Sequence, residues 1–255
     1  MKKVAVGMFG FGRTGKLVVN EFIKDPIFDV KWVVRRTKNE HHKYASRLLG
    51  HEKDEGEIFS RNDIGEDFYK KNPVDIIVDF AGTHAVRSYK AAADEGIKLI
   101  SAVSKYDTDD YEMLMALKRK TAVLYSPNIT LGINFLLIAS QLLRKIAPHA
   151  DIEIIEEHFR EKEEISGTAK KIAKALSLDE TKKINSIRVG GVVGRHEIVF
   201  GLPNQTIRLV HESINRSAFG QGAIFAAKWL IGKPKGLYSM EQIISRIFAE
   251  ANYVY

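Results

Sequence analysis

The first half of the chain alternates short apolar runs with segments of helical periodicity. The apolar runs predict strands at 3–8, 29–34, 74–80, 98–103 and 122–125, and the segments between them predict helices at 16–24, 83–95 and 109–120. Strands that alternate with helices usually form a parallel sheet with helices on both faces. The pattern therefore predicts an α/β domain.

The pattern changes after Asn128. A long apolar segment predicts a helix at 134–146, followed by a strand at 151–158 and a helix at 167–176. Three strand-like runs then follow one another, at 186–193, 196–201 and 206–212. A helix at 222–230, a Gly/Pro-rich turn at 232–236 and a last helix end the chain. Strands in succession suggest an antiparallel sheet, so we expect a second domain.

The composition is that of an ordinary globular protein, with 45% hydrophobic and 28% charged residues among 255. No apolar run reaches the roughly 18 residues of a transmembrane helix. The start, Met1-Lys2-Lys3, could open a signal peptide, but the following segment is glycine-rich and reaches Arg13 and Lys16 too soon. We therefore expect a cytoplasmic protein that does not bind membranes.

Two further counts narrow the function. The chain has no cysteine, which excludes disulfides, thiol catalysis, iron–sulfur clusters and cysteine-ligated zinc. The net charge of +7 is compatible with binding to nucleic acid, to an anionic membrane or to small anions. Because no block of five Lys or Arg occurs, and acidic residues lie among the basic ones, small anions fit best and no nucleic acid is expected.

A glycine motif lies between the first predicted strand and helix. Its residues are Gly10, Phe11, Gly12, Arg13, Thr14 and Gly15, in the pattern G-x-G-x-x-G. Such glycines allow a tight turn and let the backbone approach a pyrophosphate at the helix N-terminus. The motif predicts dinucleotide binding by a Rossmann-type domain. The alternative is a glycine-rich turn that binds nothing.

The end of the second strand bears on the choice of cofactor. An NAD-binding domain usually has Asp or Glu there for the ribose 2′-hydroxyl, but this chain has Arg35 and Arg36. Arginine pairs bidentately with a phosphate. We therefore expect NADPH to be preferred, with NADH possible. The alternative is that both arginines project into solvent.

The segment EEHFREKEEISGTAKK, at 156–171, combines cations with a helix start. His158, Arg160 and Lys162 precede Ser166, Gly167 and Thr168. Hydroxyls and free backbone N–H groups at a helix N-terminus suit a carboxylate, so we predict an anion site that binds the substrate. The alternative is that Ser166 or Thr168 only caps the helix.

Several motifs, in order along the chain, resemble those of the dihydrodipicolinate reductase (4-hydroxy-tetrahydrodipicolinate reductase) family. The family motif close to E-x-H-H-x-x-K-x-D-A-P-S-G-T-A corresponds to residues 156–169. Asp79-Phe80 is similar to the family's D-F-T strand end, and 127–134 is similar to N-F-S-x-G-V-N. The segments VGGVVGRHEIVF and GQGAIFAAKWLIGKPKGLY also resemble its C-terminal landmarks.

The resemblance implies a nucleotide domain formed by 1–127 and 217–255. It implies that 128–216 is an α+β domain with a mixed sheet, which binds the substrate and forms a homotetramer. The implied reaction is NAD(P)H-dependent hydride transfer to a cyclic imine dicarboxylate, from dihydrodipicolinate to tetrahydrodipicolinate in lysine and diaminopimelate biosynthesis.

The resemblance also implies roles for individual residues. His158 corresponds to the family's proton donor, and Lys162 to its catalytic lysine. Gly167 and Thr168 correspond to the loop that binds the substrate carboxylate. Two loops correspond to those at the nicotinamide, Ala102-Val103-Ser104 and Pro127-Asn128-Ile129-Thr130. A histidine or lysine suits this chemistry, because hydride addition to an imine builds negative charge that an acid must neutralise.

The chain departs from the family pattern at the site itself. Phe159 replaces the second histidine, Glu164-Ile165 is one residue shorter than D-A-P, and 102–106 differs from G-T-T-G-F. These changes keep two alternatives open: a relative that reduces another small imine or keto acid, and a non-catalytic NADP-binding protein. No metal is expected, since His41, His42 and His84 have no ligands at metal spacing in the sequence.

Overall fold

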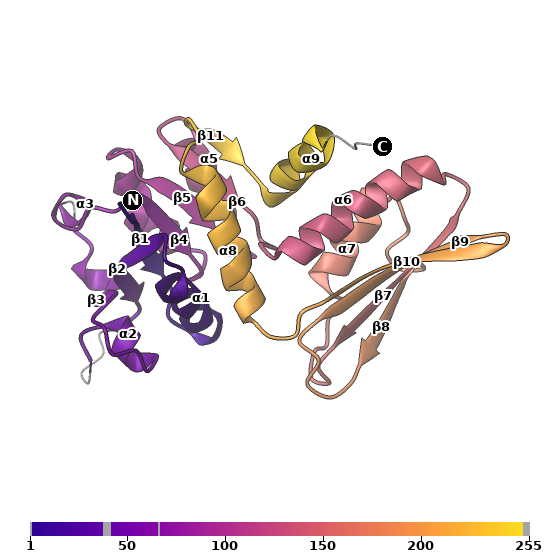
Figure 1. The fold of residues 1–255 in the computed structure, drawn as a ribbon, viewed down its shortest axis with the longest axis horizontal. Coiled ribbons are helices and arrows are strands. Elements are labelled where there is room, and N and C mark those ends of the chain that lie inside the picture. The colour runs from indigo at the N-terminus through magenta and orange to yellow at the C-terminus, as the bar shows by residue number, and fades with distance from the viewer. Residues whose placement is uncertain (1, 38–41, 66, 252–255) are drawn as a thin grey trace. The chain divides into compact units, whose positions relative to one another are not determined.

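The computed structural model describes residues 2–37, 42–65 and 67–251 (Figure 1). The chain forms two compact units. The first extends to Ile129 and includes Phe219–Met240, and the second comprises Thr130–Ala218 with the segment from Glu241. The inserted unit thus lies close to the predicted limits of 128–216. The segment after Met240, however, groups with the second unit, whereas the sequence analysis assigned 217–255 to the nucleotide domain.

The first unit contains a seven-stranded parallel sheet within the described residues. Its strands lie in the order β11-β6-β5-β4-β1-β2-β3. They are β1 (Val4–Phe9), β2 (Phe28–Arg35), β3 (Glu57–Ser60), β4 (Ile76–Asp79), β5 (Lys98–Ser101), β6 (Ala122–Tyr125) and β11 (Gly236–Tyr238). Adjacent parallel strands end at one edge, so β1, β2, β4, β5 and β6 present their following loops there.

Helices surround this sheet, as the pattern predicted. They are α1 (Arg13–Lys24), α2 (Ala45–Leu48), α3 (Phe68–Lys71), α4 (Ala85–Tyr89), α5 (Thr108–Leu117) and α8 (Ser217–Leu230), with 3₁₀ turns at Arg61–Asp63 and Lys90–Ala93. Side chains of α3, α4 and α5 pack on Trp32, Ile77 and Leu99 of the strands. Helix α8 packs on α1, where a Cβ at Gly220 would lie 2.8 Å from Glu21.

The second unit contains a four-stranded sheet in the order β10-β9-β7-β8. Its strands are β7 (Asp151–His158), β8 (Ile184–Arg188), β9 (Arg195–Leu202) and β10 (Gln205–Glu212). Its helices are α6 (Leu131–Ile146), α7 (Gly167–Ala175) and α9 (Met240–Glu250). Strands β7, β9 and β10 are antiparallel, but β8 pairs parallel with β7. The sheet is therefore mixed, as the resemblance implied, and the purely antiparallel sheet suggested by strand succession is wrong at β8.

One face of this mixed sheet carries the core. Ile154, Ile198 and Phe200 of the strands pack with Leu137 of α6 and Ile172 of α7. Side chains alternate along a strand, so the neighbours of these residues face away from α6 and α7. The core residues thus fix which side chains of β7 lie beside the start of α7.

Three strands differ from the predictions. The strand predicted at 186–193 ends at Arg188, because Gly190 adopts a φ of +51° and turns the chain. Strand β11 begins at Gly236, the last residue of the turn predicted at 232–236, and continues to Tyr238, where no strand was predicted. Strand β3 was not predicted at all. Both missed strands are short and lack the longer apolar run that marks β4, β5 and β6 in the sequence.

Candidate functional site

The glycine loop joins β1 to α1, as predicted. Gly10 has a φ of +103°, and a Cβ there would lie 2.8 Å from the backbone of Phe80 and Ala81. A Cβ at Gly15 would lie 2.3 Å from the carbonyl oxygen of Gly10. Any larger residue at these two positions would force the backbone apart, so glycine is required for the turn itself.

Gly12 serves a different purpose. No heavy atom lies within 4 Å of a Cβ built on it, and Gly12 is the N-cap of α1 without a side-chain cap. Space is therefore kept open beside the unpaired N–H groups of the first turn, where Arg13 and Thr14 begin the helix. This arrangement fits a phosphate of a dinucleotide.

A pocket of about 510 Å³ opens beside the loop. It is lined by Phe9, Gly10, Phe11, Gly12, Val34, Arg35, Arg36, Thr37, Arg61, Phe80, Ala81, Gly82, Thr83, His84 and Ala85. Both predicted arginines thus face the same pocket as the glycines, with Arg35 half-buried and Arg36 exposed. A pocket with apolar side chains on one part and arginines on another suits the phosphate-bearing adenosine half of a dinucleotide.

Arg61 is a third cation of this pocket that sequence reasoning missed. It follows β3, and its Nε donates to Ser88 Oγ at 3.1 Å. Its Nη2 donates to the carbonyl oxygen of His84. These two bonds fix the guanidinium and leave its other N–H groups available to a ligand.

The two loops expected at the nicotinamide follow β5 and β6. Ser101 and Tyr125, the last residues of these strands, are register partners, so both loops leave the same edge of the sheet. Val103 and Ile129 are buried, whereas Ser104 and Pro127 are exposed. These two loops do not line the 510 Å³ pocket, and contact with the nicotinamide ring stays a prediction.

A buried carboxylate lies at the end of β4. Asp79 accepts hydrogen bonds from the backbone N–H of Ala81 at 2.7 Å and from the Tyr89 hydroxyl at 3.0 Å. Tyr106 lies 3.5 Å away and also bonds to Ser101 Oγ at 2.7 Å. Burial raises the pKa of Asp79 to about 7, against the opposing effect of these donors. The carboxylate joins β4 to the loop after β5.

In the second unit, β7 delivers His158 beside a buried glutamate. Glu156 is fully buried, and its Oε2 bonds to Nδ1 of His158. Burial would raise the pKa of Glu156, but donors from Arg188, Ser186 and His158 lower it to about 2. Burial lowers the pKa of His158, and the bond to Glu156 opposes that shift. Since Nδ1 is engaged, Nε2 is the nitrogen left to exchange a proton with a ligand.

The loop after β7 carries the other predicted cations. The backbone N–H of Arg160 donates to Gly190 O at 3.1 Å, and that of Lys162 donates to Phe159 O at 3.1 Å. The guanidinium of Arg160 is exposed, and Lys162 is half-buried. Lys162 lies close enough to His158 for its charge to help lower the pKa of the imidazole. The structure thus brings His158 and Lys162 together.

Helix α7 begins directly after this loop. Ser166 is its N-cap, with Oγ accepting from the Ala169 N–H at 3.4 Å and bonding to His196 Nε2 at 2.8 Å. Of the two roles left open for Ser166, the structure shows capping, since its hydroxyl is buried and engaged. Gly167 is exposed, and no heavy atom lies within 4 Å of a Cβ built there. The N–H group of Gly167 therefore borders open space at the helix start.

Comparison with known proteins decides the family. The family descriptions "Dihydrodipicolinate reductase, N-terminus" and "Dihydrodipicolinate reductase, C-terminus" match residues 4–129 and 130–244. The chain belongs to the dihydrodipicolinate reductase family.

Individual relatives agree over both units. The 4-hydroxy-tetrahydrodipicolinate reductase of Caldanaerobacter subterraneus subsp. tengcongensis is 31% identical over 69% of this chain and 79% of its own. That of Halorhodospira halophila is 28% identical over 94% and 98%, respectively. The solved structure of dipicolinate-bound dihydrodipicolinate reductase from Paenisporosarcina sp. TG-14 has the same fold, with a TM-score of 0.76, 18% identity, and coverage of 95% of this chain and 100% of that one.

Membership of the dihydrodipicolinate reductase family makes the chain an NAD(P)H-dependent oxidoreductase of lysine and diaminopimelate biosynthesis. The predicted family, α/β architecture and reductase activity are confirmed. In the part of the chain that the structure describes, no helix combines the length and apolarity needed to cross a bilayer.

Three polar residues around His158 were assigned no role from the sequence. Arg188 ends β8, and Glu156 lies two residues before the histidine on β7. His196 of β9 is buried, with its ring centroid 5.3 Å from that of His158. Burial and the nearby charge of His158 lower the pKa of His196 to about 3, so it is neutral. Glu156 is the first residue of the motif at 156–169, whereas Arg188 and His196 reach this position only through strand pairing, which a motif search does not detect.

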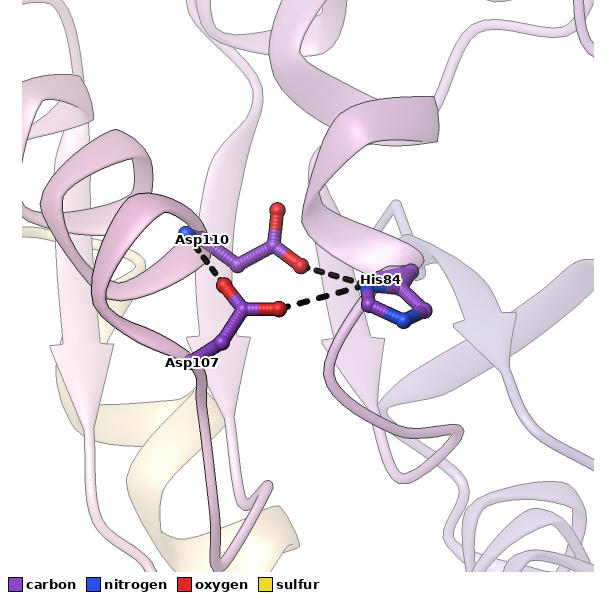
Figure 2. Close-up of side chains that lie close together, drawn as sticks. All are labelled: His84, Asp107 and Asp110. Atoms are coloured by element: carbon purple, nitrogen blue, oxygen red, sulfur yellow. Dashed lines mark hydrogen bonds and ion pairs between the residues drawn. The ribbon is translucent and has the colours of Figure 1, made fainter.

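No metal was expected at His84 because the sequence showed no further ligands at metal spacing. That argument is wrong, since the fold places two carboxylates beside His84. Helix α5 brings Asp107 and Asp110 to its ring, with Nδ1 2.7 Å from Asp110 Oδ2 and 3.6 Å from Asp107 Oδ2 (Figure 2). Arg87 also lies 2.5 Å from Asp110 Oδ1. The cations present already balance the buried Asp110, so the cluster is explained as an ion-pair network joining α4 to α5. His41 lies outside the described residues.

Proposed function

We propose that the chain reduces dihydrodipicolinate to tetrahydrodipicolinate, with His158 and Lys162 as its catalytic residues. One observation carries the proposal: the acid His158, the cation Lys162 and the start of α7 are gathered at the end of β7 in a single unit. A cyclic dicarboxylate that accepts a hydride needs an acid and a carboxylate site close to each other.

The reduction adds one hydride and one proton to the conjugated imine. NADPH, when bound, supplies the hydride. Nε2 of His158 donates the proton, because Nδ1 is held by Glu156. Lys162 neutralises the charge that builds on the substrate, and the helix start at Gly167 and Thr168 holds one carboxylate. The exposed Arg160, in the loop between β7 and α7, supplies further positive charge.

We propose NADPH as the preferred cofactor, bound by the first unit. Arg35, Arg36 and Arg61 line one pocket with the glycine loop, which supports a site for the 2′-phosphate. The loops at 102–104 and 127–130 would hold the nicotinamide end. An Arg35→Asp, Arg36→Ala variant tests this preference: NADPH affinity should fall while NADH affinity holds. Unchanged NADPH affinity would remove the argument.

We further propose that the second unit binds substrate and assembles a homotetramer through the sheet face that turns away from α6 and α7. Apolar side chains stay exposed there, including Ile187 at 43% and Val210 at 49%. A cytoplasmic location follows from the need for NADPH and a biosynthetic substrate.

The test of the reaction is NADPH oxidation with enzymatically generated dihydrodipicolinate, beside His158→Ala and Lys162→Ala. We expect turnover by the wild type and a loss of about 100-fold or more in His158→Ala, as for a general acid. If the wild type binds NADPH but shows no turnover, dihydrodipicolinate is not the substrate.

One alternative has a specific observation in its favour. Phe159 removes an imidazole, and the shorter Glu164-Ile165 step reshapes the loop before α7. A smaller imine or keto acid would suit such a site, so the same assay should include a panel of these compounds.

A further inference from the structure

We propose that Glu156 and Arg188 form a positioning pair that fixes the proton-donating edge of His158 and holds the Lys162 loop against the start of α7. The inference deepens the proposed reaction and rests on His158 and Lys162 acting in it. Neither Glu156 nor Arg188 needs to touch the substrate for this role.

Arg188 uses every N–H donor of its guanidinium. Its Nη1 and Nη2 donate to Oε2 and Oε1 of Glu156 at 3.0 and 2.7 Å. The other three donors reach backbone carbonyl oxygens: Nε to Lys162 at 2.7 Å, Nη2 to Glu164 at 2.9 Å and Nη1 to Ile187 at 2.9 Å. A guanidinium has five N–H donors, so none is left for a ligand. Arg188 is therefore a structural clamp, not a substrate-binding arginine.

Glu156 is equally committed. Besides Arg188, its Oε1 accepts from Ser186 Oγ at 2.6 Å and from the Ser166 N–H at 3.3 Å. Its Oε2 accepts from Nδ1 of His158. The carboxylate is fully buried, yet Arg188 and the other donors keep it ionised. A carboxylate that stays ionised at Nδ1 requires the hydrogen on that nitrogen.

This requirement sets the chemistry of His158. With a hydrogen on Nδ1, the neutral ring has its lone pair on Nε2, and the protonated ring donates from Nε2. Four groups with titratable or fixed charge face the imidazole: Glu156 on β7, Lys162 in the loop, Arg188 on β8 and His196 on β9. Only Glu156 favours the protonated ring, so removing its charge should make His158 a stronger acid that is protonated less often.

The same pair also anchors the loop. Arg188 binds the carbonyl oxygens of Lys162 and Glu164, and Glu156 binds the N–H of Ser166. These three contacts hold the loop at alternate positions from Lys162 to the N-cap of α7. The Glu164-Ile165 step, shorter than the related motif, is thus held without a proline.

Nitrogen-15 NMR of histidine side chains in the substrate-free wild type tests whether the pair fixes the hydrogen on Nδ1 of His158. We expect a protonated, pyrrole-type Nδ1 and a pyridine-type Nε2 for His158 when the ring is neutral. The signal is assigned by its absence in His158→Ala. A hydrogen on Nε2 of the neutral ring would overturn the proposal, whether or not the wild type turns over dihydrodipicolinate.

Three variants test whether the pair positions His158 and the Lys162 loop for the reaction: Glu156→Gln, Arg188→Met and the double variant. The control is Glu153→Gln, on the same strand but paired with Lys183. We expect Glu156→Gln to lower the titration midpoint of His158 by NMR and to reduce kcat at least about tenfold. Arg188→Met should raise KM for the dicarboxylate more than it lowers kcat, because it frees the loop.

Folding must be checked separately, since a single variant leaves a buried charge unpaired. The double variant removes both charges and should unfold at a higher temperature than either single one. If it is folded and keeps wild-type kcat, KM and His158 titration, the positioning role is refuted. If only turnover of the wild type is missing, the proposed reaction fails and the NMR result still decides the role of the pair.

Discussion

Replacing Asp79 by asparagine tests whether a buried carboxylate makes the stability of the first unit depend on pH. Burial raises the pKa of Asp79 from 3.8 to about 7. Between these values the folded protein keeps a proton that the unfolded chain has released. The free energy of unfolding therefore falls as the pH rises through this window. Above about pH 7 the whole loss of stability caused by ionising the buried Asp79 is present.

The size of the effect follows from the shift. Three pKa units correspond to about 4 kcal/mol between pH 4 and pH 8, as an upper estimate for a single buried group. Asparagine has the shape of the protonated acid and still accepts from the Ala81 N–H. The Asp79→Asn variant should thus match the wild type near pH 4 and exceed it in stability by up to about 4 kcal/mol at pH 8.

Urea unfolding of both proteins at pH 4, 6 and 8 measures the difference, and other titrating groups cancel in the comparison. Asp75→Asn is the control, since Asp75 is exposed and bonds to the Ala5 N–H in the same sheet. A wild-type minus Asp79→Asn difference that does not change with pH would refute the reasoning.

Three further outcomes follow from the site. Arg61→Ala should raise the dissociation constant of NADPH about tenfold or more and leave that of NADH unchanged. The control is Arg47→Ala, at an exposed arginine outside this pocket, which should change neither constant. Fluorescence titration measures both dissociation constants. Gly194→Ala puts a Cβ 3.1 Å from Nε2 of His158 and should lower kcat about tenfold with unchanged NADPH binding, in contrast to Gly191→Ala, where the space is open. Val210→Asp should shift sedimentation from the proposed tetramer to smaller species; a tetramer that the substitution leaves unchanged would place the interface elsewhere.

The sequence indicated those parts of the candidate site that lie close together along the chain, and their roles in binding and catalysis stay predictions. The glycine loop and the segment from His158 to Thr168 are each read within a few residues, because one strand end and one helix start carry them. Most elements of both units also followed from the pattern of apolar residues, apart from β3, β11 and the parallel direction of β8.

What the sequence could not show depends on pairing between distant strands. Arg188 meets Glu156 because β8 runs parallel to β7, with Arg188 in register with His158. The succession of strands suggested the opposite direction. Arg61 reaches the pocket through β3, which the pattern missed, and His84 gains its aspartates from a helix more than twenty residues away. In each case the partner is defined by three-dimensional register and not by local spacing.

The parallel pairing of β8 with β7 gives the second unit a β7–α7–β8 crossover of the same kind as β1–α1–β2 in the first. Each crossover leaves a strand, turns through a loop and offers the first turn of a helix to an anion. In the proposed reaction, the same strand–loop–helix arrangement is thus used twice, once for a cofactor phosphate and once for a substrate carboxylate. Residues 159–166 lie between β7 and α7, outside the paired strands, so substitutions of exposed residues there can alter the proposed substrate site without changing a strand register.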